Sequence, residues 1–231
     1  MRIFVYGKPH DTGDLFEDYL DPARTAIVSI DMHRGHLDPS PQCPCPAPRA
    51  REIVAPIGAF HDGARALGIP VIHVRSVLRR GGVDDIHGIS AAWRRTFPLY
   101  VGEIPNSDAH AIEGSPWTEF VTRVAPDDLV VETKKRLSAF YPTDLDFLLR
   151  NMRVDALVLN GGFTDCCILN AAFDASNRNY RVIVARDLAR GTDENLENAA
   201  LAMVSLHLGL VADSADILAE WRNRKVGRNA A

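Results

Sequence analysis

Val158-Leu-Asn-Gly-Gly-Phe-Thr-Asp-Cys-Cys-Ile-Leu-Asn-Ala-Ala172 is the stretch of sequence from which the fold can be worked out. The apolar run 156–159 stops at a Gly-Gly pair, Thr164 offers a helix N-cap, and small or apolar residues then recur at helical spacing. This order predicts a strand, a tight turn and a helix with Cys166 and Cys167 in its first turn. A thiol in that place lies beside unpaired backbone N–H groups and the positive end of the helix dipole, which lower its pKa.

Five further apolar runs flank this stretch, with the near-continuous pattern of parallel strands that are buried on both faces. They lie at 25–30, 69–74, 129–132, 181–185 and 209–211. Helical periods separate them, over 51–67, from Thr143 as N-cap onward, over 194–206 and over 216–221. The alternation predicts an α/β fold, a Rossmann-like, doubly wound and mostly parallel six-stranded sheet with helices on both faces.

The chain is expected to form one globular domain with a short extension. Its 231 residues are 46% apolar, which suits a single core, and no linker-like segment divides them. Residues 1–24 are predicted to be an N-terminal arm laid on a domain that spans 25–231.

Composition and motifs exclude several classes of function. The net charge is −4 and the isoelectric point is near 6.1, without a large basic cluster, so no nucleic-acid partner is expected. No apolar run approaches about 18 residues, and the N-terminus is too polar for a signal peptide, so we expect a cytoplasmic protein without a membrane partner. The first strand is not followed by a G-x-G-x-x-G motif, so dinucleotide binding is not implied.

Charged and nucleophilic residues follow three of the predicted strands. Asp31 follows the first, Lys134 and Lys135 follow the run at 129–132, and the two cysteines follow the Gly-Gly turn. Because parallel strands end at the same edge of a sheet, these groups can meet there as base, cation and nucleophile. The alternatives are a turn aspartate and a solvated basic turn, and the residues alone do not choose between the two thiols.

Three blocks of sequence resemble a known family, in this order along the chain. They are Ile27-Val-Ser-Ile-Asp-Met32, the run 131–140 with Thr143-Asp-Leu145, and Leu159-Asn-Gly-Gly-Phe-Thr-Asp-Cys-Cys-Ile168. Over roughly residues 24–220 the chain resembles the isochorismatase-like cysteine hydrolases. That family includes nicotinamidases, N-carbamoylsarcosine amidohydrolase, ureidoacrylate amidohydrolase and biuret hydrolase.

The resemblance implies a catalytic triad of Asp31, Lys134 and Cys167. The family lysine lies in the pattern Lys-x-Arg-x-Ser-Ala-Phe, which selects the first of the two lysines. The family cysteine comes three residues after the threonine of Gly-x-Thr-Asp-x-Cys, which leaves Cys166 as a spacer.

The resemblance also implies how charge is stabilised during the reaction. Backbone N–H groups of Phe163 and Cys167 would form an oxyanion hole, and the Gly162–Phe163 peptide bond would be cis. The implied activity is hydrolysis of a linear C–N bond in a small amide, carbamoyl or ureido compound through a thioester, with release of ammonia or an amine. A homodimer or homotetramer is implied as well.

The chain departs from the family where substrate contacts are expected. The family commonly has Asp-x-Gln-x-Asp-Phe after the first strand, whereas this chain has Asp31-Met-His-Arg-Gly-His36. His33 and His36 therefore become candidates for substrate binding, with solvated loop histidines as the alternative.

The long irregular region 75–118 is expected to supply pocket walls, since long loops in compact domains are commonly functional. It contributes Trp93 and Trp117 as candidate substrate contacts. Arg190, after the fifth strand, is a candidate anion-binding residue, with a surface arginine as the alternative.

No cofactor or metal is expected from the sequence. Nicotinamidases hold a metal by an Asp-x-His just after the second strand, where this chain has Arg75-Ser-Val77. Asp85-Ile-His87 lies too far along the chain to replace that pair. Cys43-Pro-Cys45 could hold a soft metal, but the surrounding prolines favour a plain surface loop.

Two other functions remain open. A vinyl-ether hydrolase of the isochorismatase type would need no thiol, so the cysteine at 167 argues against it. A non-catalytic family member that binds a small ligand would not need all three triad positions.

Overall fold

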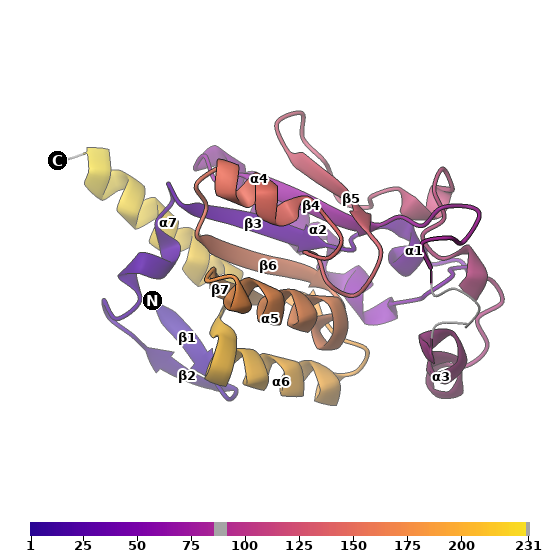
Figure 1. Cartoon of the computed structure of the whole chain (residues 1–231). Coiled ribbons are helices and arrows are strands. Elements are labelled where there is room, and N and C mark those ends of the chain that lie inside the picture. The colour runs from indigo at the N-terminus through magenta and orange to yellow at the C-terminus, as the bar shows by residue number, and fades with distance from the viewer. Residues whose placement is uncertain (86–91, 230–231) are drawn as a thin grey trace.

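The computed structural model describes residues 1–85 and 92–229 (Figure 1). At its centre is a six-stranded sheet of order β5-β4-β3-β6-β7-β8, in which all neighbouring strands are parallel. The strands are β3 (Thr25–Ile30), β4 (Val71–Ser76), β5 (Leu129–Lys134), β6 (Ala156–Gly162), β7 (Arg181–Arg190) and β8 (Gly209–Ala212). The predicted parallel α/β sheet is therefore confirmed.

Helices cover both faces of this sheet. The α-helices of the described residues are α1 (Arg34–Leu37), α2 (Val54–Ala66), α3 (Ala92–Val101), α4 (Leu145–Asn151), α5 (Leu169–Asn177), α6 (Glu194–Met203) and α7 (Ser214–Asn229). On one face α2 and α7 meet where Phe60 stacks on Trp221, with ring centroids 5.9 Å apart. On the other face α4 and α5 contribute Leu149 and Ala172 to a second core (Figure 1). Every residue of β3 is buried, which explains its unbroken apolar pattern.

Strand β7 is longer than the sequence predicted. It continues to Arg190 instead of ending at Ala185, so that Ala189 and Arg190 pair with Gly161 and Gly162 of β6 after a shift in register. Arg190 is therefore the last residue of a strand and not part of a loop beyond it.

The first residues form a hairpin of β1 (Arg2–Val5) and β2 (Lys8–Asp11). The side chain of Arg2 pairs with Asp213 and Asp216, at 3.1 Å each, near the start of α7. These ion pairs tie the two ends of the fold together.

The region 75–118 carries the short helix α3, which lies off the end of the sheet (Figure 1). None of the residues of α3 is fully buried, although Trp93 and Phe97 pack partly against the core. Among the described residues, no helix combines the length and the apolar character that crossing a membrane requires.

Candidate active site

The first residue of the site is Asp31, which follows β3 directly. Its backbone adopts a left-handed φ of 56°, and its N–H donates to the Val74 carbonyl at 2.8 Å. This turn leaves the carboxylate 2% exposed beside the end of β4, where the Ser76 N–H donates to Oδ1 at 3.2 Å. The strand exit thus fixes the carboxylate inside the protein.

Lys134 is the last residue of β5, and its side chain reaches Asp31 past the end of β4, the strand that lies between β5 and β3. The register of the sheet places Ser76 opposite Lys134. The Nζ atom of Lys134 lies 2.7 Å from Asp31 Oδ2, 2.9 Å from Ser76 Oγ and 3.5 Å from Cys167 Sγ. One ammonium group therefore contacts both the acid and the thiol that the sequence singled out.

Cys167 lies in a π-helical turn, Thr164–Ile168, between β6 and α5. The expected N-cap is wrong, because Thr164 Oγ1 has no hydrogen-bond partner among the described residues and Phe163 occupies the cap position. The wider turn separates the two thiols, whose sulfur atoms are 4.0 Å apart. Of the pair, Cys167 is the buried one and the one in contact with the lysine ammonium.

The Gly-Gly pair shapes the approach to this turn. Gly161 has a φ of +117°, and a Cβ there would come within 2.1 Å of the Ile30 carbonyl oxygen. The next peptide bond, Gly162–Phe163, is cis. The Phe163 carbonyl then accepts the N–H of Cys166 at 3.2 Å and that of Ile168 at 3.0 Å, the residues on either side of the nucleophile candidate.

Burial and charge set the protonation of the cluster. Burial would raise the pKa of Asp31, but the Lys134 ammonium and nearby histidines outweigh it and hold that pKa well below its usual range. Burial would lower the pKa of Lys134, and the Asp31 charge reverses that shift. The hydrogen bond to Cys166, burial and the Asp31 charge raise the pKa of Cys167, contrary to the lowered value expected for a helix N-terminus. At neutral pH the cluster is a carboxylate, an ammonium and a thiol.

His33 and His36 are buried next to this cluster and are not solvated loop residues. His33 Nε2 lies 3.8 Å from Asp31 Oδ1, and the ring of His36 packs edge-on against Phe163 at 5.4 Å. His110 joins them, with its ring centroid 4.9 Å from that of His36.

Burial keeps these three imidazoles neutral. It lowers the pKa of His33 to about 3, helped by the neighbouring His36. Burial is also the main reason why the pKa values of His36 and His110 are lowered, and the shift is strong for His110.

The remaining candidate contacts lie in different places. Trp93 packs edge-on against His110, with centroids 5.3 Å apart. Trp117 contributes its carbonyl, 2.9 Å from His33 Nδ1, while its ring lies 5.9 Å from the Arg34 guanidinium.

The contacts of Arg190 are with residues outside the triad. Its guanidinium donates to the carbonyls of Arg186 and Ala189 and lies 3.7 Å from Glu197 and 3.9 Å from Glu52. This placement gives no support to the anion-binding role expected for it.

Two segments of the sequence were considered as metal sites, Cys43-Pro-Cys45 and Asp85-Ile-His87. Cys43 and Cys45 are buried free thiols, so the expectation of a plain surface loop is wrong. Cys43 Sγ packs 3.3 Å from the Gly35 carbonyl. Asp85 pairs with Arg94 at 2.6 Å, and residue 87 lies outside the described residues.

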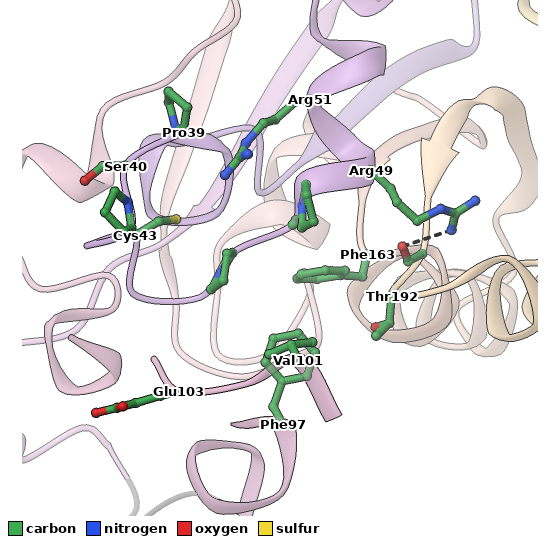
Figure 2. Close-up of a pocket in the computed structure, with 15 residues that line it drawn as sticks. Pro39, Ser40, Cys43, Arg49, Arg51, Phe97, Val101, Glu103, Phe163 and Thr192 are labelled. Carbon is green, nitrogen blue, oxygen red and sulfur yellow. Dashed lines mark hydrogen bonds between the residues drawn. The ribbon is translucent and has the colours of Figure 1, made fainter. Parts of the chain in front are cut away.

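A pocket of about 360 Å³ adjoins the site (Figure 2). Its walls include the proline-rich loop 39–48, Phe97 of α3 and Phe163, which also borders the buried cluster. Arg49 lines it too, with Nη1 donating to the Gly191 carbonyl at 3.2 Å (Figure 2). The pocket therefore meets the site at Phe163, and its lining does not include Asp31, Lys134 or Cys167.

Sequence reasoning missed two residues of the site. Ser76 bridges Asp31 and Lys134 from the end of β4, and the same argument from strand ends could have found it. His110 lies in an irregular loop, where no periodicity marks it.

Comparisons with known proteins agree with this geometry. A family model described as the isochorismatase domain matches residues 25–216. N-carbamoylsarcosine amidase from an Arthrobacter species is 28% identical over 169 residues, which are 71% of this chain and 58% of the amidase, so less than two thirds of that relative is spanned. Maleamate amidohydrolase from Pseudomonas putida is 28% identical over 201 residues, 87% of this chain and 88% of that enzyme.

The fold is shared with solved structures. A cysteine hydrolase from Pseudomonas syringae pv. phaseolicola superposes with a TM-score of 0.76 at 25% identity. The match covers 89% of this chain and 95% of that one, so the parallel sheet and its helices are common to both.

Proposed function

Because this chain belongs to the isochorismatase family of hydrolases, we propose that it is a cysteine-dependent amidohydrolase acting on a small amide, carbamoyl or ureido compound. The observation that carries the proposal is the contact of one buried ammonium, Lys134 Nζ, with both Asp31 and Cys167. A thiol, a base and a fixed positive charge in contact are what nucleophilic attack on a carbonyl carbon requires. The names of the two amidase relatives support a linear C–N bond as the target.

The first half-reaction forms a thioester. Asp31 takes the thiol proton of Cys167 as the sulfur attacks the carbonyl carbon, and the C=O pair moves onto oxygen. Lys134 stabilises the sulfur as negative charge develops on it, since its ammonium lies 3.5 Å away. The tetrahedral intermediate then collapses, and the amine leaves with the proton that Asp31 took.

Backbone N–H groups of Phe163 and Cys167 are proposed to bind the oxyanion. The N–H groups of Cys166 and Ile168 are committed to the Phe163 carbonyl, and that of Cys167 lies between them in sequence. Removing one donor of such a hole costs about 10²–10³ in kcat in well-studied hydrolases.

The second half-reaction restores the enzyme. A water molecule gives a proton to Asp31 and attacks the thioester carbon, and the sulfur leaves as a thiolate that takes the proton back. The net reaction is amide plus water to acid plus amine, and it requires no redox partner.

A panel assay tests the proposal. Purified protein is incubated with primary amides, N-carbamoyl amino acids and ureido acids, and released ammonia or amine is measured, with Cys167→Ala as the comparison. Turnover that is lost in Cys167→Ala supports a cysteine amidohydrolase. Equal activity of the two proteins on the best substrate contradicts it. No turnover of any compound in the panel, together with a ligand that raises the melting temperature, also contradicts it and supports a binding protein.

The homodimer or homotetramer implied by the family resemblance stays a prediction. Sedimentation equilibrium of the full chain measures the mass of the particle in solution. A particle mass of one chain contradicts it.

A further inference from the structure

Three histidines converge beside the active site without a role in the proposed reaction. His33 lies in the turn after β3, His36 lies in α1, and His110 comes from the loop that follows α3. One ring nitrogen from each lies within 4.8 Å of the other two. We propose that His33, His36 and His110 bind one divalent transition-metal ion of the Zn²⁺ type.

One distance within the cluster fits a shared metal ion. His36 Nε2 and His110 Nε2 are 3.4 Å apart. Two nitrogen ligands at 2.0–2.1 Å from a tetrahedral zinc are about 3.3–3.4 Å apart. A direct N–H···N hydrogen bond would be shorter, at about 2.7–3.2 Å if it resembled other N–H bonds in proteins. The separation therefore suits two lone pairs that face one ion better than it suits a bond between the rings.

The outward nitrogens of two rings are already fixed. His36 Nδ1 lies 2.9 Å from the Cys45 carbonyl, and because a carbonyl only accepts, this Nδ1 carries the proton and His36 Nε2 has a free lone pair. His33 Nδ1 lies 2.9 Å from the Trp117 carbonyl and 3.2 Å from the Gly35 N–H, and the shorter of these two contacts favours a proton on Nδ1. Histidines that bind metals are oriented in this way by a carbonyl or carboxylate on the far nitrogen.

His33 provides a second observation. Its side chain is completely buried, and Nε2 has no hydrogen-bond partner among the described residues. A buried polar atom without a partner is costly and calls for an explanation. Coordination to an ion supplies the missing partner.

An acidic group borders the cluster. The Asp31 oxygen Oδ1 lies 3.8 Å from His33 Nε2. Three neutral nitrogen ligands are suited to zinc and its neighbours and leave a fourth position for water or a substrate oxygen. This place differs from the Arg75–Val77 segment, where the sequence lacks the metal pair of nicotinamidases.

Metal content tests the proposal independently of turnover, so its failure and that of the amidohydrolase can be told apart. The full chain is stripped with a chelator, dialysed against excess Zn²⁺ and then against buffer, and its zinc is measured by mass spectrometry. Wild type is expected to keep about one ion per chain. Loss of outer-sphere partners costs 10–100-fold in affinity, so His110→Ala, which removes a ligand, is expected to weaken Zn²⁺ binding by about 100-fold or more.

Two controls keep the test specific. His10→Ala removes an exposed histidine of the N-terminal hairpin and is expected to retain the ion. Cys167→Ala is expected to retain it too, and Co²⁺-loaded wild type is expected to show no sulfur-to-cobalt charge-transfer band. Folding of each variant is checked by circular dichroism. Wild type without stoichiometric zinc, a folded His110→Ala with unchanged affinity, or a cobalt–thiolate band would each overturn the proposal.

Discussion

Lys134 Nζ lies 2.7 Å from Asp31 Oδ2, and both side chains are almost completely removed from water. Breaking such a pair leaves an uncompensated charge inside the protein, because the remaining partner cannot be rehydrated. The pair is therefore a structural element as well as a part of the proposed reaction.

Single substitutions in this pair are expected to be more costly than the double substitution. Asp31→Asn and Lys134→Met should each lower the free energy of unfolding by about 3–5 kcal/mol, since each leaves one buried charge without its partner. The double variant should lose clearly less than the sum, by about 0.5–3 kcal/mol. Urea denaturation at pH 7 measures all three.

An exposed pair gives the control for this cycle. Arg24 lies 2.5 Å from Asp155 but is more than half exposed, so Arg24→Met should cost about 0–1 kcal/mol. Strictly additive losses for the buried pair would show that the two charges do not depend on each other.

The thioester is expected on Cys167 and not on its neighbour. When the best substrate is mixed with enzyme and quenched in acid, peptide mass spectrometry should find the acyl group on Cys167. Cys166→Ala should keep this adduct and retain kcat within about tenfold, whereas Cys167→Ala should lose the adduct and about 10³-fold or more in kcat. An adduct on Cys166 would show that Cys166 is the nucleophile, and it would contradict the role that we propose for Cys167.

Gly161 is expected to tolerate no side chain. A methyl group there would meet the Ile30 carbonyl at 2.1 Å, on a φ of +117° that other residues rarely adopt. Gly161→Ala should therefore lower the free energy of unfolding by about 3 kcal/mol or more, or prevent folding.

Gly58 provides the matched control, because an added Cβ in the middle of α2 has no atom within 4 Å. Gly58→Ala should stabilise the protein by about 0.5–1 kcal/mol. Thermal denaturation compares the two, and equal effects would argue against the close approach of β6 to β3.

Acid sensitivity is expected to depend on His61. Burial lowers its pKa to about 3 in the folded protein, with help from His73 and Arg65, while the unfolded value is near 6.5. Between these two values the unfolded state binds the extra proton, so stability falls as pH falls, by about 1.4 kcal/mol per pH unit for this residue. Above pH 6.5 the effect vanishes.

His61→Gln should lower the number of protons taken up on unfolding by one, and so reduce the slope of the free energy of unfolding against pH. The free energy of unfolding, measured by urea at several values between pH 4.5 and 7.5, should therefore fall less steeply with acid than in wild type. Identical slopes for wild type and His61→Gln would mean that His61 is protonated at the same pH in both states.

Much of the site could be predicted from where the strands end. Asp31 and Lys134 each follow or end an apolar run, and a parallel sheet brings such ends together whatever their separation in sequence. The residues alone did not distinguish Cys166 from Cys167, because the distinction depends on the π-helical turn that points one sulfur at the lysine. The family pattern selected Cys167, and the structure places that sulfur beside Lys134.

The rest depends on contacts that no local pattern encodes. The extension of β7 beyond Ala185 needs the glycines of β6 as partners across a shift in register. His110 meets His36 from 74 positions away, through a loop without periodicity. Helices and strands are recognised in a sequence by the repeat of their apolar residues, and because this loop has no such repeat, the sequence does not place its side chains.

The ion pair between Asp31 and Lys134 joins residues 103 positions apart, and the thiol lies another 33 beyond. A contiguous part of the chain that contains all three groups must include all of residues 31–167, so a short fragment cannot carry a working remnant of the site. Each of the three is supplied by a different strand or turn, and the cluster comes into being only when the centre of the sheet has assembled. Turnover in this protein should therefore disappear at the same denaturant concentration as the tertiary structure, in a single all-or-none step.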